Sequence, residues 1–206
     1  MKEEGVIKFN CHWIEAEPLD DACIEKLNDW RGRLYALGLI GVTKDGIGYG
    51  NMSMRFNEEQ FIITGSGTGR LKKLSSMHYA KVTAYDLDQN SVTTRGPIMA
   101  SSESLTHAAI YKTKKDIHAV FHVHHHALWK KLLRTLPSTG TDIPYGTPEM
   151  AMAVIRLIKE TKEANQRIFA MTGHEDGIVA FGRDTDETGK ILLDQLKTGK
   201  TAKKRP

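Results

Sequence analysis

The stretch Val120-Phe121-His122-Val123-His124-His125-His126 is a short apolar run that ends in three consecutive histidines. Its valine and phenylalanine content predicts a buried β-strand. Because successive side chains of a strand point to opposite faces, His122 and His124 should share a face, with Cα atoms roughly 6.5–7 Å apart. Two imidazoles at this spacing can converge on one metal ion, although a lone His-x-His motif is more often simply packed or solvated. The rest of the sequence must decide between these interpretations.

The composition describes a globular protein of ordinary size. With 206 residues, 40% of them hydrophobic and 26% charged, the chain is long enough to bury a full core. No apolar run approaches the ~20 residues needed to cross a membrane, and the N-terminal stretch lacks the apolar segment of a secretory signal. Cys11 and Cys23 have no metal-binding or redox spacing, which suits a reducing compartment. We therefore expect a cytoplasmic protein with no membrane partner.

The net charge of +4 would favour nucleic-acid binding if it were spread over the folded surface. Five positive charges instead lie within the last ten residues, which leaves a net charge of −1 for the rest of the chain; they are Lys197, Lys200, Lys203, Lys204 and Arg205. We expect residues 1–196 to form a single domain, residues 197–206 to be a disordered basic tail, and no nucleic-acid partner.

Hydrophobic periodicity predicts strands and helices on both sides of the histidine strand. An opening strand is expected at residues 6–9, and a helix at 20–37 with Asp20 as its cap. Further strands are expected at 52–56, 61–64, 81–86, 167–172 and 178–181, and further helices at 101–114, 127–133, 148–161 and 184–196. The turn Gly173-His174-Glu175-Asp176-Gly177 separates the last two strands.

Two glycine-rich loops, at residues 46–50 and 65–69, do not match nucleotide-binding signatures. Taken alone, such loops are more often tight turns than ligand sites. The backbone N–H groups and hydroxyls of Thr64-Gly65-Ser66-Gly67 could nevertheless hold a phosphate. Ser101 and Ser102 are similarly ambiguous, because they can cap a helix or bind an anion, with Glu103 facing whatever lies beside it.

The order of these motifs resembles the class II aldolase/adducin family, which includes sugar-phosphate aldolases, a ribulose-phosphate epimerase and a methylthioribulose-phosphate dehydratase. The matching segments span about residues 30 to 182. They are Gly50-Asn51-Met52-Ser53, Thr64-Gly65-Ser66-Gly67, Ser101-Ser102-Glu103 with His107 and Tyr111, His122-Val123-His124, Tyr145-Gly146-Thr147-Pro148-Glu149, and a third histidine before Gly177. Ser-Ser-Glu-x-x-x-His followed about twenty residues later by His-x-His is far more specific than either part.

The resemblance implies an α/β fold, a three-layer α/β/α domain around a mostly antiparallel mixed sheet, commonly assembled as a homotetramer. It implies that His122, His124 and a third histidine hold a divalent metal, usually Zn²⁺, and that Glu103 is the acid/base. The implied phosphate-binding residues are Asn51, Ser66, Gly67, Ser101 and Ser102. The expected activity is that of a metal-dependent aldolase, a lyase that cleaves or forms a small phosphorylated ketose through a metal-stabilised enediolate.

Two departures from the family pattern leave alternatives open. The third family histidine directly precedes the glycine, where this chain has Asp176; we expect His174 to replace it, with Asp176 as the rival. The family's proton-donor tyrosine falls at Asp142, so Tyr145 is only a candidate donor. A sugar-phosphate 4-epimerase or a dehydratase would use the same site, whereas a non-catalytic scaffold of the adducin type would lack the metal.

Overall fold

The computed structural model describes residues 5–161 and 166–201, and its main feature is an eight-stranded sheet. The strand order is β1-β7-β6-β5-β4-β8-β10-β9, and every neighbouring pair is antiparallel except β1 and β7. The bounds are β1 Asn10–Glu15, β4 Asn51–Arg55, β5 Phe61–Thr64, β6 Tyr79–Asp86, β7 Ser91–Gly96, β8 Ala119–His124, β9 Ile168–Ala170 and β10 Gly177–Gly182. A separate hairpin joins β2 (Gly41–Val42) to β3 (Gly48–Tyr49).

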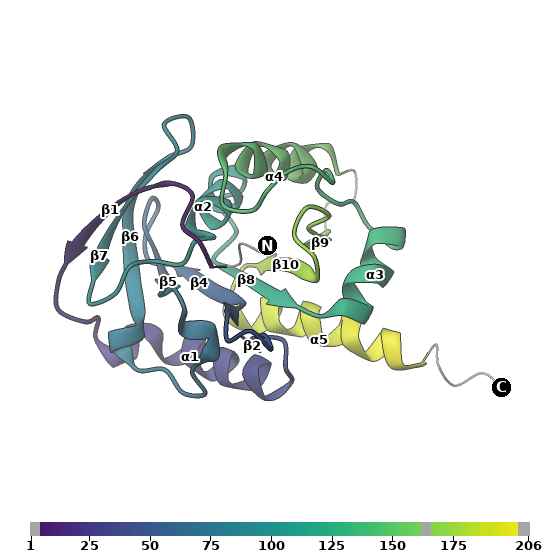
Figure 1. Cartoon of the computed structure of the whole chain (residues 1–206), viewed down its shortest axis with the longest axis horizontal. Helices are drawn as coiled ribbons and strands as arrows, with labels where there is room; N and C mark the ends of the chain where they lie inside the picture. The colour runs from purple at the N-terminus through teal and green to yellow at the C-terminus, as the bar shows by residue number, and fades with distance from the viewer. Residues whose placement is uncertain (1–4, 162–165, 202–206) are drawn as a thin grey trace.

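Five α-helices complete the described part of the chain and cover both faces of the sheet (Figure 1). They are α1 Asp21–Ala36, α2 Ser104–Thr113, α3 His126–Thr135, α4 Pro148–Glu160 and α5 Thr185–Thr201, with short 3-10 turns at Thr68–Arg70 and Ser76–His78. Helices α2 and α4 lie on one face, and α1 and α5 lie on the other. The predicted three-layer α/β/α architecture around a mostly antiparallel sheet is confirmed.

Within the described ranges, no helix combines the length and apolar character that a membrane-spanning segment needs.

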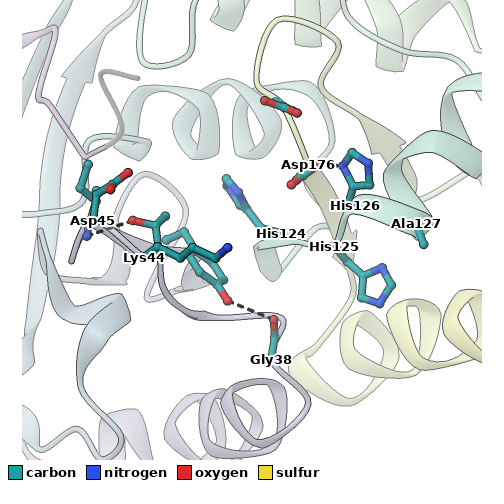
Figure 2. Close-up of a pocket in the computed structure, with 12 residues that line it drawn as sticks. Gly38, Lys44, Asp45, His124, His125, His126, Ala127 and Asp176 are labelled. Atoms are coloured by element: carbon teal, nitrogen blue, oxygen red, sulfur yellow. Dashed lines mark hydrogen bonds and ion pairs between the residues drawn. The ribbon is translucent and has the colours of Figure 1, made fainter. Parts of the chain in front are cut away.

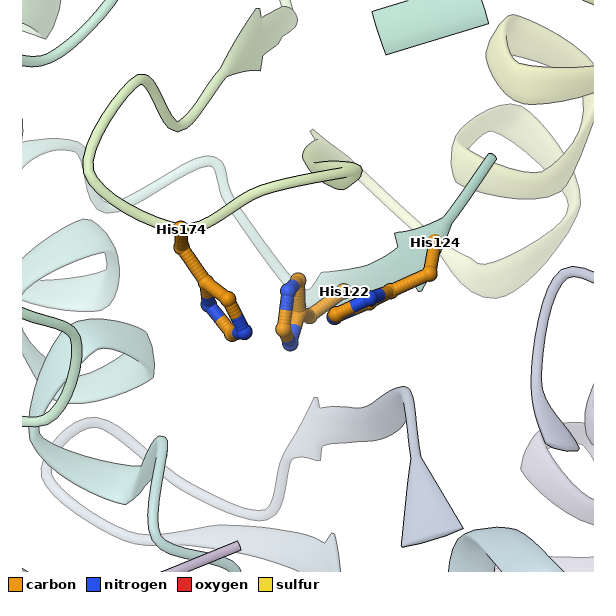
Figure 3. Close-up of side chains that lie close together, drawn as sticks. All are labelled: His122, His124 and His174. Carbon is orange, nitrogen blue, oxygen red and sulfur yellow. The ribbon is translucent and has the colours of Figure 1, made fainter. Parts of the chain in front are cut away.

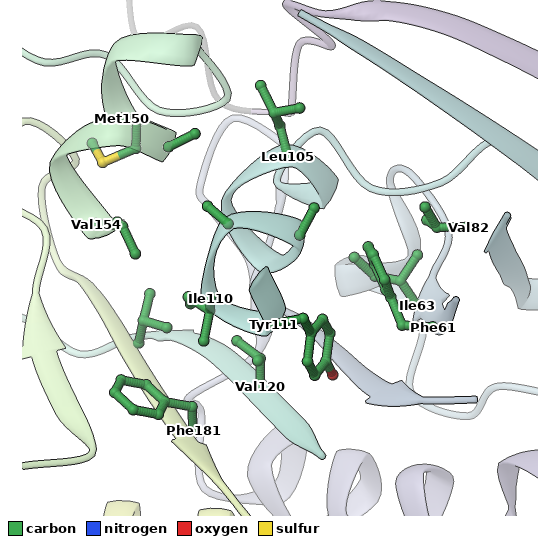
Figure 4. Close-up of a cluster of buried hydrophobic side chains, with 14 of the residues drawn as sticks. Phe61, Ile63, Val82, Leu105, Ile110, Tyr111, Val120, Met150, Val154 and Phe181 are labelled. Atoms are coloured by element: carbon green, nitrogen blue, oxygen red, sulfur yellow. The ribbon is translucent and has the colours of Figure 1, made fainter. Parts of the chain in front are cut away.

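Alternation along the strands supplies a hydrophobic core on each face of the sheet. Val120 belongs to the core beneath α2 and α4 (Figure 4), and its neighbour Phe121 belongs to the core beneath α1 and α5. Val179 and Ile178 on β10 divide between the two cores in the same way. Each fully buried side chain of this size contributes about 1.5–3 kcal/mol, so the two cores together fix the central strands that carry the histidines.

Polar residues begin two of the helices as the sequence predicts. The side chain of Asp20 accepts a hydrogen bond of 2.9 Å from the backbone N–H of Ala22 at the start of α1. Thr147 caps α4 by accepting a 3.3 Å bond from the N–H of Met150, and Pro148 occupies the first helical position.

Several predicted boundaries are wrong. The first strand, β1, lies at Asn10–Glu15 rather than at residues 6–9. It is a mostly exposed edge strand, so it lacks the alternation of buried and exposed residues that marks a strand. Strand β7 was not predicted. Helix α2 begins at Ser104, because the residues from Ser101 form a turn closed by a 3.0 Å bond from Ser104 N–H to Ser101 O. Helix α5 continues to Thr201, past the predicted end at Leu196, and residues 202–206 of the predicted tail lie outside the described residues.

Candidate metal centre

Three histidines converge at the end of strand β8 (Figure 3). His122 and His124 lie two residues apart on β8, and their ring centroids are 5.0 Å apart. His174 comes from the turn between β9 and β10, with its ring centroid 4.9 Å from that of His122 and 4.8 Å from that of His124. One nitrogen of each ring lies within 4.8 Å of the other two. We call these three residues the histidine cluster.

The turn before β10 brings His174, and not Asp176, to the other two histidines. Asp176 adopts a left-handed backbone with φ of 68°, and its Oδ1 lies 2.6 Å from Nδ1 of His126. A Cβ atom on Gly177 would lie 2.9 Å from the carbonyl oxygen of His174 and 3.2 Å from Nε2 of His122. Glycine at this position therefore permits the close approach of the two rings.

Burial keeps the ring of His122 in its neutral form. His122 is 1% exposed, and burial together with the neighbouring imidazoles of His124 and His174 holds its pKa well below the ordinary histidine value. A metal requires a neutral imidazole. Nε2 of His122 has no hydrogen-bond partner among the described residues, and leaving such a buried atom unpaired costs about 1–3 kcal/mol. The histidine cluster thus fits a divalent ion such as Zn²⁺, with one coordination position left open.

A buried carboxylate lies beside the histidine cluster. Glu103 is 2% exposed, and its Oε1 lies 3.3 Å from Nδ1 of His174. Glu103 occupies the position immediately before α2. The sequence had instead suggested that it lies within the first turn of the helix. Neither carboxylate oxygen receives a hydrogen bond within the described part of the chain. A carboxylate in this setting is free to exchange a proton with a bound molecule.

A small polar recess adjoins Glu103 and His174. Its wall is formed by the loop after β5, the turn before α2 and neighbouring residues, and it includes all five predicted phosphate-binding residues: Asn51, Ser66, Gly67, Ser101 and Ser102. Two backbone bonds hold the loop and the turn together, from Ser66 N–H to Met99 O at 2.8 Å and from Ser101 N–H to Thr64 O at 3.2 Å. The recess has a volume of about 20 Å³.

A buried arginine supports the loop after β5 through its backbone carbonyl groups. Arg31 of α1 is 2% exposed and donates hydrogen bonds of 3.1 Å to the carbonyl oxygens of both Thr68 and Gly69. A third bond, of 3.0 Å, reaches the carbonyl oxygen of Lys72. Arg31 was not predicted from the sequence, although its spacing from Leu27 and Leu34 puts it on the buried face of the helix.

A buried trio ties the turn before α2 to the central sheet. Oγ of Ser53 on β4 lies 2.6 Å from Nδ1 of His107 and 2.8 Å from the hydroxyl of Tyr111, both on α2. Burial lowers the pKa of His107 to about 3 and raises the pKa of Tyr111, so both groups are neutral at pH 7. The trio fixes α2, and with it Glu103, relative to β4.

A larger cavity opens beside His124 (Figure 2). Its volume is about 660 Å³, within the range of small-molecule sites, and its wall includes Lys44, Tyr49, His126 and Asp176. His124 lines this open cavity and His174 lines the polar recess, so the histidine cluster lies between the two spaces.

A family model, the class II aldolase and adducin N-terminal domain, matches residues 41–193. The chain belongs to this family. A search of curated proteins found no matching sequence.

Solved structures with the same fold include several aldolases. An L-fuculose 1-phosphate aldolase is 19% identical over 88% of this chain and 84% of its own, with a TM-score of 0.64. A sugar-phosphate aldolase from Thermotoga maritima is 17% identical over 90% of this chain and 97% of its own, with a TM-score of 0.65. YgbL from Escherichia coli, described as an aldolase, epimerase or decarboxylase, is 20% identical over 90% and 92% of the two chains, with a TM-score of 0.66. At these identities the likeness shows a shared fold.

The candidate proton donor of this class II aldolase-family chain lies in the polar recess. The ring of Tyr145 stacks on that of His174, with centroids 4.6 Å apart and planes inclined by 27°. The hydroxyl of Tyr145 accepts a 3.2 Å hydrogen bond from the backbone N–H of Val6, and Nζ of Lys8 lies 4.2 Å from the ring centroid. The N-terminal segment therefore covers Tyr145 on its side of the recess.

Proposed function

We propose that this chain is a metal-dependent lyase that cleaves or forms a small phosphorylated ketose, as a class II aldolase does. The observation that carries the proposal is the convergence of the histidine cluster with the buried carboxylate of Glu103, beside a recess lined by every predicted phosphate-binding residue. Three imidazole ligands with one open position favour Zn²⁺ or a similar divalent ion.

The proposed chemistry divides among three groups. A bound divalent metal would polarise the substrate carbonyl and stabilise the negative charge that develops on its oxygen. Glu103 would give and take the proton that the reaction moves, because its carboxylate is buried next to His174 and receives no hydrogen bond from the described residues. Tyr145 would donate a second proton from its hydroxyl, whose oxygen accepts a hydrogen bond from the backbone N–H of Val6.

The two cavities suggest how a phosphorylated sugar would lie. The polar recess would hold the phosphate through backbone N–H groups and hydroxyls, and the carbon chain would pass the histidine cluster toward the open cavity. At about 20 Å³ the recess has room for about one water molecule, so phosphate entry requires part of its wall to move outward. That wall includes Gly5 and Tyr145.

The family resemblance further supports a homotetramer, and the spacing of Cys11 and Cys23 suits a protein that works in the reducing cytoplasm. Light scattering coupled to size-exclusion chromatography tests the assembly directly: a mass of about four chains is expected, and a monomeric mass would contradict it.

Metal content and sugar-phosphate cleavage together test the function. We expect about one metal ion per chain in the wild type, in Glu103→Gln and in Asp176→Ala, and loss of the metal in His174→Ala. Wild type should cleave a phosphorylated ketose, and Glu103→Gln should slow this step about 10²–10⁴-fold. Loss of metal in Asp176→Ala alone would transfer the ligand role to Asp176.

Two results would replace the proposal. Conversion of the sugar to an epimer without cleavage would identify an epimerase on the same site. A wild-type protein that binds no metal after reconstitution, and in which Glu103→Gln changes nothing, would favour a non-catalytic scaffold.

A further inference from the structure

Asn51 lies directly opposite the first histidine of the cluster. It pairs with His122 across the antiparallel strands β4 and β8, and its Nδ2 lies 3.1 Å from Nδ1 of that ring. Asn51 is 8% exposed and His122 is 1% exposed, so water cannot readily replace this contact. The family resemblance makes Asn51 a phosphate-binding residue, yet its carboxamide is held against a proposed metal ligand.

The orientation of the Asn51 carboxamide decides which nitrogen of His122 is available. With Nδ2 facing the ring, Nδ1 must accept, so the ring proton sits on Nε2 and blocks metal binding. Asn51 Oδ1 and His122 Nε2 are then both buried without a hydrogen-bond partner among the described residues. Because the two ends of a carboxamide have nearly the same size, a half-turn exchanges them without moving other atoms.

We propose that Asn51 is a positioning residue of the metal centre: its Oδ1 accepts the Nδ1–H proton of His122 and leaves the Nε2 lone pair for the metal. In this orientation the buried oxygen gains its partner, and Nδ2 turns toward the polar recess that Asn51 lines. One side chain then links the metal ligand to the phosphate site. The proposal rests on the proposed function and adds to it a role in metal binding.

Such partners are a general requirement of metal-binding histidines. The hydrogen bond on the distal nitrogen fixes the tautomer and the ring orientation, and its loss typically weakens metal binding about 10–100-fold. In this chain the strand register places Asn51 beside the distal nitrogen of His122, so the β4–β8 pairing that builds the sheet also orients the His122 ring.

The ring tautomer can be measured without any metal. We expect ¹⁵N NMR of the metal-free wild type at neutral pH to show His122 with its proton on Nδ1, the signal being assigned by its loss in His122→Gln. A proton on Nε2 would overturn the proposal.

Metal affinity of matched variants is the second test. We expect the dissociation constant for Zn²⁺ to rise about 10–100-fold in Asn51→Ala and to stay near the wild-type value in Asn51→Asp, whose carboxylate still accepts from Nδ1–H. Ser66→Ala is the matched control, because Ser66 lines the same recess and should affect binding of inorganic phosphate without changing zinc affinity. Far-ultraviolet circular dichroism checks that each variant is folded.

The outcomes separate this proposal from the proposed function. Wild-type zinc affinity in Asn51→Ala would overturn the positioning role and leave the lyase intact. Equal loss of zinc in Asn51→Asp and Asn51→Ala would also overturn it, because an accepting oxygen would then not suffice. A wild type that binds no zinc would refute the proposed function and this role together.

Discussion

His107 is a fully buried imidazole whose neutral form is built into the fold. Burial lowers its pKa to about 3, whereas an exposed histidine titrates near 6.5. Between these two values the unfolded chain binds a proton that the folded chain does not. Stability should therefore fall as the pH drops below about 6.5, by up to about 1.4 kcal/mol per pH unit for this residue.

The substitution His107→Asn tests this pH dependence. Asparagine cannot be protonated, and its amide can still reach Oγ of Ser53, which lies 2.6 Å from the histidine ring. We expect lower stability at pH 7.5, by about 1–3 kcal/mol, but a shallower loss of stability between pH 7 and 5, measured by urea unfolding. His12→Asn on the exposed strand β1 is the control. A slope equal to that of wild type would show that His107 does not cause the dependence.

At the residue level, the sequence predicted the chemistry of the site better than its contacts. The period of a strand places His122 and His124 on one face, and the structure has their rings 5.0 Å apart. The contact between Asn51 and His122 depends on which strands pair and in which register, and no local pattern encodes that. The carbonyl contacts of Arg31 arise in the same way, from a helix packed under a distant loop.

Helices α1 and α5 pack against each other through Trp30 of α1. Each helix contains a glycine, and only the glycine of α5 lies against the Trp30 ring. A Cβ atom on Gly189 of α5 would lie 2.2 Å from the Trp30 ring, whereas Gly32 of α1 has nothing within 4 Å of an added Cβ. The indole nitrogen of Trp30 also donates a 2.7 Å bond to Asp186 of α5. Gly189 is therefore required by packing, and Gly32 is not.

Alanine at these two positions should have opposite effects. Gly32→Ala is expected to raise the free energy of unfolding by about 0.5–1 kcal/mol, because alanine is the better helix former. Gly189→Ala gains the same helix preference but must push the Trp30 ring aside, and a net loss of about 1–3 kcal/mol is expected. Guanidinium unfolding of both variants measures the difference; shifts of the same sign would contradict this account of the α1–α5 contact.

Most elements with a buried apolar face could be predicted, including the edge strand β9, but the strand pair β1 and β7 could not. Helices α1 and α4 show apolar periodicity and polar caps, and both begin where expected. Strand β1 buries little, so its sequence shows no alternation, and its partner β7 was missed with it. The start of α2 was misplaced because serines can cap a helix or form the turn before it.

Hydrophobic cores lie on both faces of the sheet, and a chain of 206 residues is long enough to fold on such cores without a metal. Chelation of the proposed metal should therefore leave a folded protein with a lower melting temperature. Zinc at about 1,000 times its dissociation constant would stabilise the fold by about 4 kcal/mol through mass action. Scanning calorimetry with EDTA and with zinc measures this shift, and His174→Ala should show none. Complete unfolding by the chelator would mean that the metal is needed for the fold itself.

At the scale of the molecule, the sequence motifs were sufficient to predict the fold and the family, and insufficient to predict which substrate the proposed enzyme takes. The recess and the open cavity combine residues from the loop between β2 and β3, the loop after β5, the turn before α2 and the turn before β10. Substrate choice depends on how these loops are arranged, and that arrangement follows from tertiary packing.

The displaced third histidine has a consequence for how related chains are recognised. A filter that demands histidine immediately before the glycine of β10 would discard this sequence as lacking the third histidine, since Asp176 stands there. In space, His174 reaches the other two rings because Asp176 takes a left-handed backbone and Gly177 carries no side chain. Genome surveys for the proposed metal site should therefore allow this two-residue displacement and keep any chain with the pattern His-x-Asp-Gly at this turn.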